Sequence, residues 1–419
     1  MQYLVLKSIK LKTKCVTNNI LLIFGPLLLL VVIASFMQSR AFILGLIVAT
    51  IFAWIQYNDL KIKRIQILFI SIAIITIGVF LAYAIKSDST LGRLLIYKIS
   101  WRMFTDNFFT GVGLGNFKIK YGLYQASYFK SGNYTEKEFL LADNVFFAFN
   151  DYWQFIIETG IIGIITIASC TYLICEIIRK SLVDDKDNKI LLLATSLFIA
   201  ICVAALFTHV FEKLFFQLFS ITIIAWLIVI NLPLRANVKK TIAIILPIIF
   251  VGYQNFFLLL SYKSYNKFEQ AKLLSTTGYV TESRKIYAEI YPVLKNDANF
   301  MRFYIDDLPY SSKSEVIVIL ENYLHLIKYR TDNRTYMRLA VTYERLNLNS
   351  KAELTYLFAV NMVPNRFRTR LALFNFYINT KNNRKAKTIG TQILEMPIKI
   401  PSNEVEIIKQ EVIKKMKLI

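Results

Sequence analysis

The stretch from Lys86 to Gly163 is the only long polar segment between the membrane-length apolar segments of this chain. It opens with Lys86-Ser-Asp-Ser-Thr-Leu-Gly-Arg93, passes through Gly111-Val-Gly-Leu-Gly-Asn-Phe117 and closes with Glu158-Thr-Gly-Ile-Ile-Gly163. A connection this long is usually either functional or disordered. It is rich in Tyr, Phe and Trp, whereas disordered segments are poor in aromatic residues. We therefore expect the chemistry of the protein to lie here.

The composition indicates a membrane protein. The chain has 419 residues, of which 55% are hydrophobic, whereas soluble domains average roughly 45–50% apolar residues. A helix needs about 20 mostly apolar residues to cross the hydrocarbon core of a bilayer. Seven segments meet this requirement and are predicted to span the membrane: Ile20–Met37, Ala41–Tyr57, Ile65–Ile85, Tyr152–Ile178, Ile190–Phe207, Leu214–Leu232 and Thr241–Ser261.

The basic residues predict the topology. The net charge of +22 comes from Lys and Arg that cluster between the apolar segments, as topology determinants do, so we expect no nucleic-acid partner. Basic clusters precede the first predicted span and follow the second, fourth and sixth, and these segments are expected to be cytoplasmic. The N-terminus is then cytoplasmic, whereas the loop 86–151, here called the central loop, and the C-terminal domain are exported. The membrane domain is predicted to cover residues 1–261.

The composition changes at Tyr262, and residues 262–419 are polar, charged and helical in period. The small, aromatic and proline residues of one segment follow the spacing of a tetratricopeptide helix pair, and a shift of 34 residues repeats part of the pattern. We therefore expect an all-α protein, in which a polytopic membrane domain is followed by a soluble tetratricopeptide-like domain; an irregular helical bundle is the alternative. Such repeats bind partners or brace a neighbour and carry no chemistry themselves. The residues that fit the spacing are Ala340, Tyr343, Ala352, Tyr356, Ala359 and Pro364, with Tyr377 and Ala386 in the shifted copy.

Two arginines are candidates for binding an anion. Arg40 lies at the tip of a predicted helix hairpin, and Arg93 lies just beyond the third predicted span, on the same side of the membrane. The guanidinium group binds phosphate through two parallel hydrogen bonds, so a diphosphate is a suitable ligand. The alternative is that both side chains only extend from helix ends towards the membrane surface.

Ionisable residues next to a predicted span are candidates for catalysis, because charged groups at that depth are costly. Asp143, Asp151 and Glu158 flank the start of the fourth predicted span, together with Asn144 and Asn150. His209 lies at the outer end of the fifth, on the same side of the membrane. The glycines of Gly111–Gly115 lack the Lys-Ser/Thr of a phosphate-binding loop, so they indicate a turn rather than a nucleotide site. Neither a metal site nor a cofactor is predicted, because no His, Cys and carboxylate set has the spacing of metal ligands.

Three elements of the sequence resemble the O-antigen ligase/polymerase family of bacterial membrane glycosyltransferases. Ser39-Arg40 resembles the Ser-Arg hairpin of the family, and Gly92-Arg93, Trp101 and Gly111–Phe117 resemble the opening of its large periplasmic loop. Asn150, followed after nine residues by Gly160-Ile-Ile-Gly163, resembles its His-Asn-x9-Gly-x-x-Gly signature, although the histidine position holds Phe149. The chain resembles a version with fewer N-terminal spans and a C-terminal tetratricopeptide-like domain.

The resemblance implies an enzyme that transfers a glycan without a metal ion and with inversion. The donor would be an oligosaccharide linked to polyprenyl diphosphate, and the acceptor would be lipid A core, another repeat unit or a protein. Arg40 and Arg93 would hold the diphosphate, with Asn150 also binding substrate. The base would be sought among Asp143, Asp151 and His209. The location would be the bacterial inner membrane, with the C-terminal domain in the periplasm.

Two other classes of function compete with a glycan ligase or polymerase. One is a catalytically degenerate member of the family that acts as a scaffold, in which the exported repeats recruit a protein partner. The other is a transporter, which should carry ionisable groups along a path through the membrane. The predicted spans are almost free of such groups, so a transporter is the weaker alternative.

Overall fold

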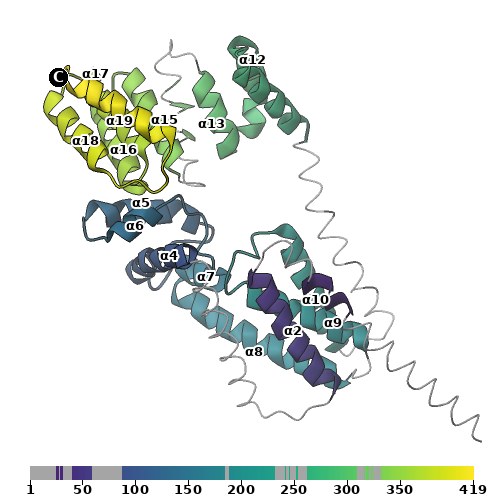
Figure 1. Cartoon of the computed structure of the whole chain (residues 1–419). Coiled ribbons are helices and arrows are strands. Elements are labelled where there is room, and N and C mark those ends of the chain that lie inside the picture. Colours follow the sequence, from purple (N-terminus) through teal and green to yellow (C-terminus); the bar gives the residue numbers. More distant parts are fainter. Residues whose placement is uncertain are drawn as a thin grey trace, which may run out of the picture. The chain divides into compact units, whose positions relative to one another are not determined.

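In the computed structural model, the regular secondary structure of the described residues consists of α-helices joined by turns and loops. The described residues are 25–27, 29–31, 40–58, 87–184, 188–231, 241, 245, 252, 262–308, 316, 318–319, 322–323 and 332–419. Figure 1 shows their arrangement. The helices are α2 Arg40–Tyr57, α4 Ser87–Asp106, α5 Phe117–Lys130, α6 Glu136–Leu141, α7 Asp151–Thr159, α8 Ile161–Asp184, α9 Lys189–Ala204, α10 Leu214–Asn231, α12 Val280–Leu294, α13 Ala298–Asp307, α15 Asn333–Arg345, α16 Asn349–Met362, α17 Phe367–Asn379, α18 Asn383–Glu395 and α19 Asn403–Met416.

The chain forms two compact units. The first, here called the membrane unit, consists of residues 1–90, 148–156 and 161–255, and the second, the loop–repeat unit, consists of residues 91–147, 157–160 and 256–419. The sequence-based division placed the central loop with the membrane domain. In the structure, most of that loop belongs to the same unit as the C-terminal helices, because its helices pack against them.

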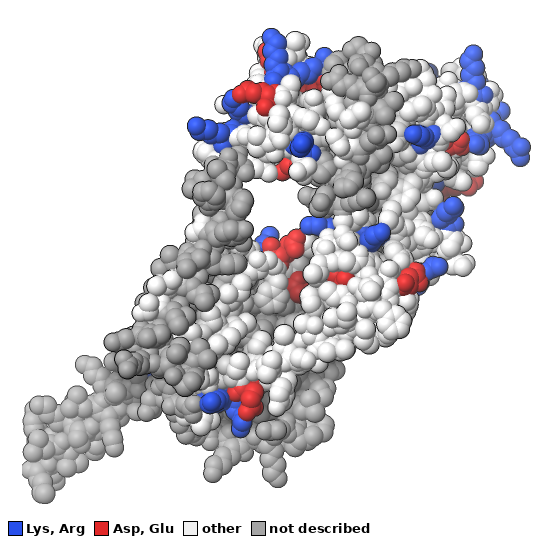
Figure 2. Space-filling model, turned by 180° about the vertical axis from the view of Figure 1, so that it is seen from behind, with Lys and Arg blue, Asp and Glu red and all other residues white. Residues whose placement is uncertain are grey.

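Three described helices are long and apolar enough to cross a membrane. They are Arg40–Tyr57, Ile161–Val183 and Leu214–Asn231, and Lys189–Ala204 is a shorter apolar helix. Figure 2 shows Lys, Arg, Asp and Glu gathered over the C-terminal helices and sparse over the described spans. Most of the first and last predicted spans and all of the third lie outside the described residues, so the number of spans stays a prediction.

The fourth predicted span is wrong as a single helix over Tyr152–Ile178. Helix α7 ends at Thr159, and α8 begins at Ile161. Gly160 separates the two helices and has φ +67°, a left-handed conformation that glycine adopts readily. The span is therefore α8 alone, and α7 is a separate short helix that precedes it.

Helices α2 and α9 make a close contact in the membrane unit. A Cβ atom at Gly45 would lie 2.3 Å from the carbonyl oxygen of Ala200, so only glycine allows this approach. Ala49 and Ala53 of α2 are fully buried in the same contact, together with Leu192 of α9. Small residues let helices approach closely in membranes, where van der Waals packing replaces the hydrophobic driving force.

The C-terminal helices form pairs, as the tetratricopeptide spacing predicted. Helices α15 and α16 are joined by residues 346–348 and pack along each other, and α17 pairs with α18 in the same way. Ala340, Ala352 and Ala359 are fully inaccessible, so they occupy the positions where paired helices need small side chains. The assignment of these pairs to the tetratricopeptide class itself stays a prediction.

The central loop packs against these repeats through two of its helices. Helix α5 lies along α16, with Ala126 in a small core beside Met362 and Val363. Phe139 of α6 belongs to the larger core that contains Ala340 and the interior residues of α17 and α18. The loop and the repeats therefore share hydrophobic cores, and they fold as one unit.

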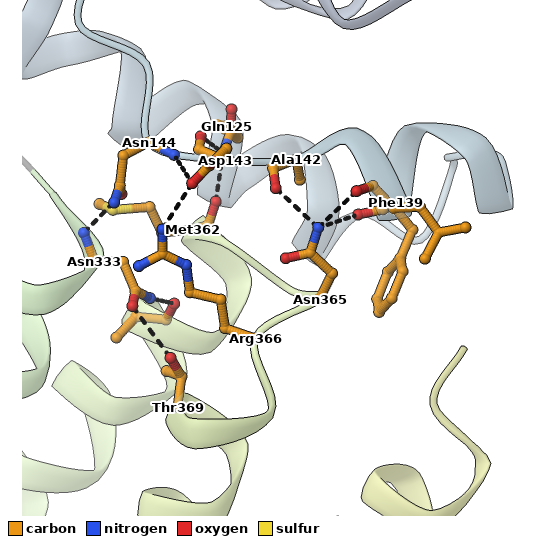
Figure 3. Close-up of polar contacts among 12 residues, drawn as sticks. Gln125, Phe139, Ala142, Asp143, Asn144, Asn333, Met362, Asn365, Arg366 and Thr369 are labelled. Atoms are coloured by element: carbon orange, nitrogen blue, oxygen red, sulfur yellow. Dashed lines mark hydrogen bonds and ion pairs between the residues drawn. The ribbon is translucent and has the colours of Figure 1, made fainter. Parts of the chain in front are cut away.

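The loop and the repeats also cap each other's helices (Figure 3). Asn365 directs its side-chain amide at the carbonyl oxygens of Phe139, Leu140 and Ala142, at 3.1, 2.8 and 2.9 Å, and so satisfies the C-terminal end of α6. In return, Asn144 accepts the backbone N–H of Asn333, the first residue of α15, at 2.9 Å. Helix ends leave such groups without partners inside the helix, so each side supplies what the other lacks.

Two further polar contacts reinforce the joint. Arg366 pairs with the carboxylate of Asp143 at 2.7 Å. Gln125, which is buried, donates to the carbonyl oxygens of Asp143 and Met362 at 2.9 and 2.5 Å. The ion pair is partly exposed and contributes little by itself, since exposed pairs are typically worth at most about 1 kcal/mol. The buried amide contacts carry more of the specificity.

Replacing Asn365 by Asp tests whether this capping holds the loop to the repeats. Asp has the same shape but presents oxygen instead of N–H to the carbonyl groups, and an unsatisfied buried polar group costs about 1–3 kcal/mol. We expect the amides of residues 136–144 to exchange with deuterium about tenfold faster in N365D, a change equivalent to about 1.4 kcal/mol. Hydrogen exchange with mass spectrometry of the full chain provides the measurement.

N347D is the matched control for this experiment. Asn347 lies in the turn between α15 and α16 with φ +61°, a conformation that Asp also tolerates. No change in exchange over residues 136–144 is expected there. Equal exchange over 136–144 in N365D and in the unaltered chain would show that the loop does not depend on Asn365.

Candidate functional site

The glycine-rich segment of the central loop is a turn that wraps the end of α7. Gly111, Gly113 and Gly115 all have positive φ, at +68°, +97° and +72°. The N–H of Val112 donates to the carbonyl oxygen of Ile157 at 3.0 Å, and that of Gly113 donates to the carbonyl oxygen of Glu158 at 2.9 Å. The turn therefore satisfies carbonyl groups that the end of a helix leaves without partners.

The side chain of Glu158 completes this joint. It is 7% exposed, and its two oxygens accept the backbone N–H groups of Gly115 at 2.9 Å and Phe117 at 3.2 Å. Phe117 is the first residue of α5, so the carboxylate also lies at the positive end of that helix. Four N–H groups of the turn are thus used within the protein. The segment is a structural joint rather than a cradle for phosphate, as its sequence indicated.

Gly160 fits into the other side of the same turn. A Cβ atom there would lie 2.5 Å from the carbonyl oxygen of Phe108 and 2.7 Å from the backbone nitrogen of Gly111. Both partners are backbone atoms, which cannot rotate away as a flexible side chain can. Gly111 lies inside the central loop and Gly160 lies after it, and both positions need glycine because their backbones pack against each other.

In the membrane unit, Asp151 holds the turn that carries His209. Its carboxylate accepts the backbone N–H groups of Val210 and Phe211 at 2.7 and 2.9 Å. Its own N–H donates to the carbonyl oxygen of Ala205 at 2.9 Å. These bonds join residues far apart in the sequence, so the start of α7 and the segment after α9 form one local structure.

His209 lies beside Phe149, the residue at the histidine position of the family signature. The two rings meet edge to face with their centroids 5.6 Å apart. Phe149 has φ +54°, which is uncommon for a residue other than glycine and occurs often at functional sites. A histidine supplied from a different segment therefore lies next to the position where the signature histidine is missing.

The carboxyl group of Asp151 has an elevated pKa. Burial raises the pKa of this group to about 6, because desolvation of the charged form outweighs the N–H bonds from Phe211 and Val210; the nearby Glu212 raises it further. At neutral pH the group is therefore mostly ionised. A carboxylate with a pKa near the working pH is suited to accept a proton.

The other predicted residues are distributed over both units. Asn150 caps α7, where its side-chain oxygen accepts the N–H of Trp153 at 2.9 Å. Arg40 is exposed at the first residue of α2 in the membrane unit, whereas Arg93 lies half-buried on α4 in the loop–repeat unit. Asp143 also belongs to the loop–repeat unit, where Arg366 neutralises it. The membrane unit thus brings together Asn150, Asp151 and His209.

The described residues contain no group of three or more His, Cys, Asp and Glu placed to hold a metal ion. The chemistry that this arrangement offers is that of a carboxylate and an imidazole near a membrane span, with cationic side chains elsewhere in the chain.

The comparison with family models bears directly on this site. Residues 25–168 match the model of the O-antigen ligase family. The match covers 144 of the 419 residues, so this segment is similar to the O-antigen ligase family. No curated protein and no solved structure matches the chain. Together with three described helices that are long and apolar enough to cross a membrane, this match indicates a membrane protein.

The family match includes the central loop and the glycine joint, by which we mean the turn Gly111–Gly115 with Glu158 and Gly160. It also includes Arg40, Arg93 and Asp151, and it ends before His209 and the repeats. The sequence did not reveal the structural role of Glu158, although few acidic residues lie between Asp151 and Arg179. It also gave no sign of Asn365 and Arg366, because contacts between distant segments leave no local pattern.

Replacing Gly160 by Ala tests the packing between the glycine turn and the end of α7. Gly132 also has a positive φ, +78°, but a Cβ atom there meets nothing within 4 Å. We expect G132A to lower the free energy of unfolding by about 1–2 kcal/mol, the cost of the left-handed conformation alone. G160A should lower it by more, because the backbone at Phe108 must also move. Thermal unfolding of the full chain in detergent provides the measurement, and equal losses in the two variants would contradict the close packing.

Proposed function

We propose that the chain is a membrane-embedded glycan ligase or polymerase. It transfers an oligosaccharide from a polyprenyl diphosphate carrier to an acceptor hydroxyl during the assembly of surface polysaccharide. The observation that carries the proposal is the pairing of Asp151 with the turn of His209 beside Phe149. This places two groups that can take a proton beside the position where the family signature has its histidine.

The proposed reaction is a direct displacement at the anomeric carbon. The acceptor oxygen forms a bond to that carbon and gives its proton to a base on the protein. The bond from the carbon to the diphosphate oxygen breaks, and polyprenyl diphosphate leaves with the electron pair. We assign the base to Asp151, because its raised pKa of about 6 leaves it ionised yet more basic than an ordinary carboxylate. His209 is the second candidate.

Arg40 and Arg93 are proposed to hold the diphosphate. Planar guanidinium groups form paired, charge-assisted hydrogen bonds to phosphate oxygens and stabilise the negative charge that grows on the leaving group. Asn150 is proposed to contact the substrate through its amide nitrogen, since its oxygen caps α7. We place Asp143 in the joint between loop and repeats rather than in the reaction, because it pairs with Arg366.

The proposal implies a bacterial inner-membrane location with a cytoplasmic N-terminus and a periplasmic central loop and C-terminal domain. The donor is a polyprenyl-diphosphate-linked glycan, and the acceptor is lipid A core, a second repeat unit or a protein. The C-terminal repeats brace the central loop through the capping contacts described above. Any protein partner would bind a face of the repeats that the loop leaves open.

Replacing Asp151 by Asn separates its chemistry from its structural role. The Asn oxygen can still accept the N–H groups of Val210 and Phe211, but it cannot take the acceptor's proton. We expect the transfer rate to fall by about 10²–10⁴-fold, the usual contribution of a general base. The measurement is glycan transfer by the purified chain in proteoliposomes that contain a polyprenyl-diphosphate-linked oligosaccharide and an acceptor. In the unaltered chain, activity should fall as the pH drops below about 6, because protonation of Asp151 removes the base.

E136Q is the matched control, since Glu136 is an exposed carboxylate on α6 that lies in the other unit. It should retain full activity. Loss of activity in D143N together with an active D151N would show that the base is assigned to the wrong carboxylate. If the unaltered chain transfers no glycan while its family relatives do so under the same conditions, the scaffold alternative is favoured, in which Phe149 marks a lost catalytic histidine.

A further inference from the structure

Helix α4 and the turn after it carry large apolar side chains that face away from the protein core. Leu94, Trp101 and Phe108 are spaced by seven residues, so the first two lie on one side of α4 and the third continues their line into the turn. Their exposed fractions are 54%, 57% and 38%. Phe109 and Leu114 in the adjoining turn are 74% and 70% exposed. We call these five residues the apolar ridge.

The ridge is separate from the face of α4 that packs inside the protein. That inner face is formed by Leu95, Ile99 and Met103, which are all at most 4% exposed. One apolar face of α4 is therefore buried in the core, whereas the apolar side chains of the ridge are exposed. Soluble surfaces usually show single apolar side chains, whereas a continuous row marks an interaction site.

The turn after α4 packs against the residue that directly precedes α8. Phe108 and Gly111 lie against Gly160 through their backbone atoms. Gly160 is directly followed by Ile161, the first residue of the span Ile161–Val183. Phe108, at the end of the ridge, therefore contacts the residue that directly precedes this candidate span. This link to a helix that is long and apolar enough to cross a membrane indicates that lipid covers the ridge.

The residue types also fit a lipid surface. Trp and Phe are favoured at the boundary between headgroups and acyl chains, and an amphipathic helix can lie there with its apolar side inserted. Arg102 follows Trp101 and is exposed as well. A cationic side chain beside the apolar row can reach lipid phosphates while the aromatic ring enters the layer below.

We propose that the apolar ridge inserts into the leaflet in which α8 begins and anchors the central loop to the lipid surface. The occupant of this face is the bilayer itself, not a second copy of the chain and not another protein. Insertion would add a lipid contact to the glycine joint, so that α4 lies along the membrane boundary. The inference rests on the membrane location of the chain and not on the proposed reaction.

Cysteine labelling tests the proposal with a matched pair of positions. Phe109 is 74% exposed in the loop–repeat unit, and Leu354 on α16 is 70% exposed in the same unit. Each is replaced by Cys in a full chain whose four natural cysteines are changed to Ala. The chain is placed in nanodiscs of phosphatidylcholine and phosphatidylglycerol. We expect a charged maleimide to label F109C about tenfold more slowly than L354C, because an inserted side chain must first leave the lipid. Equal rates would overturn the proposal.

Trp101 fluorescence identifies what covers the ridge. In a chain whose other three tryptophans are changed to Phe, Trp101 should be quenched by lipids that carry a spin label near the headgroup. The control chain has Trp101 changed to Phe and a single Trp at Tyr279, which is 60% exposed near the start of α12, and it should be quenched much less. Slow labelling of F109C without quenching of Trp101 would mean that protein covers the ridge, and this result would overturn the proposal as well.

Discussion

The buried carboxylate of Glu158 needs hydrogen-bond donors, and it finds them in the backbone N–H groups of Gly115 and Phe117. An ionised group removed from water is costly unless it is fully bonded, so this contact fixes where the glycine turn can lie. This glycine turn also requires glycine at positions 111 and 160, because a Cβ atom at either position would collide with backbone atoms of the facing segment. The central loop is thus fastened at the residue before the span α8, and the positions of α4 and α5 follow from that attachment.

The other end of the loop is fastened by the repeats. Asn365 satisfies the last carbonyl groups of α6, and Asn144 satisfies the first N–H of α15. A loop held at both ends can keep its segments in fixed positions, which suits a protein whose proposed substrate groups come from separate parts of the chain. We propose that the repeats act as a brace for this loop, a role that would account for a helical domain beside the proposed ligase site.

Much of the fold follows from local sequence patterns, and the remainder does not. Apolar length identified α2 and α10, and the spacing of Ala340, Ala352 and Tyr356 identified paired helices before their burial was known. The break at Gly160 was missed, because the apolar residues on both sides of Glu158-Thr-Gly160 were assigned to one span, and the backbone contacts that require the break lie elsewhere in the chain. The joint between loop and repeats was missed for a similar reason: hydrogen bonds between residues some two hundred positions apart leave no periodic trace in a single sequence.

The candidate site divides in the same way. The residue types pointed to Asp151 and His209 as possible bases, but only the structure joins them, through the N–H groups of Val210 and Phe211. It also gives Asp143 a structural partner that the sequence could not supply, because Arg366 belongs to a domain assigned no role in the site. The sequence therefore identifies carboxylates that are candidates for catalysis. It cannot distinguish a carboxylate that could act as a base from one that holds two segments together.

The most direct test of the account is the surface glycan of a strain that lacks this chain. The strain is complemented either with the unaltered chain or with R93K, and glycan length is compared at equal membrane levels of the two proteins. If Arg93 holds the diphosphate, the unaltered chain restores the glycan, whereas R93K accumulates in the membrane without restoring it, because Lys cannot form the paired contact. Full restoration by R93K would contradict the account, since it would mean that Arg93 only anchors a helix end at the membrane surface.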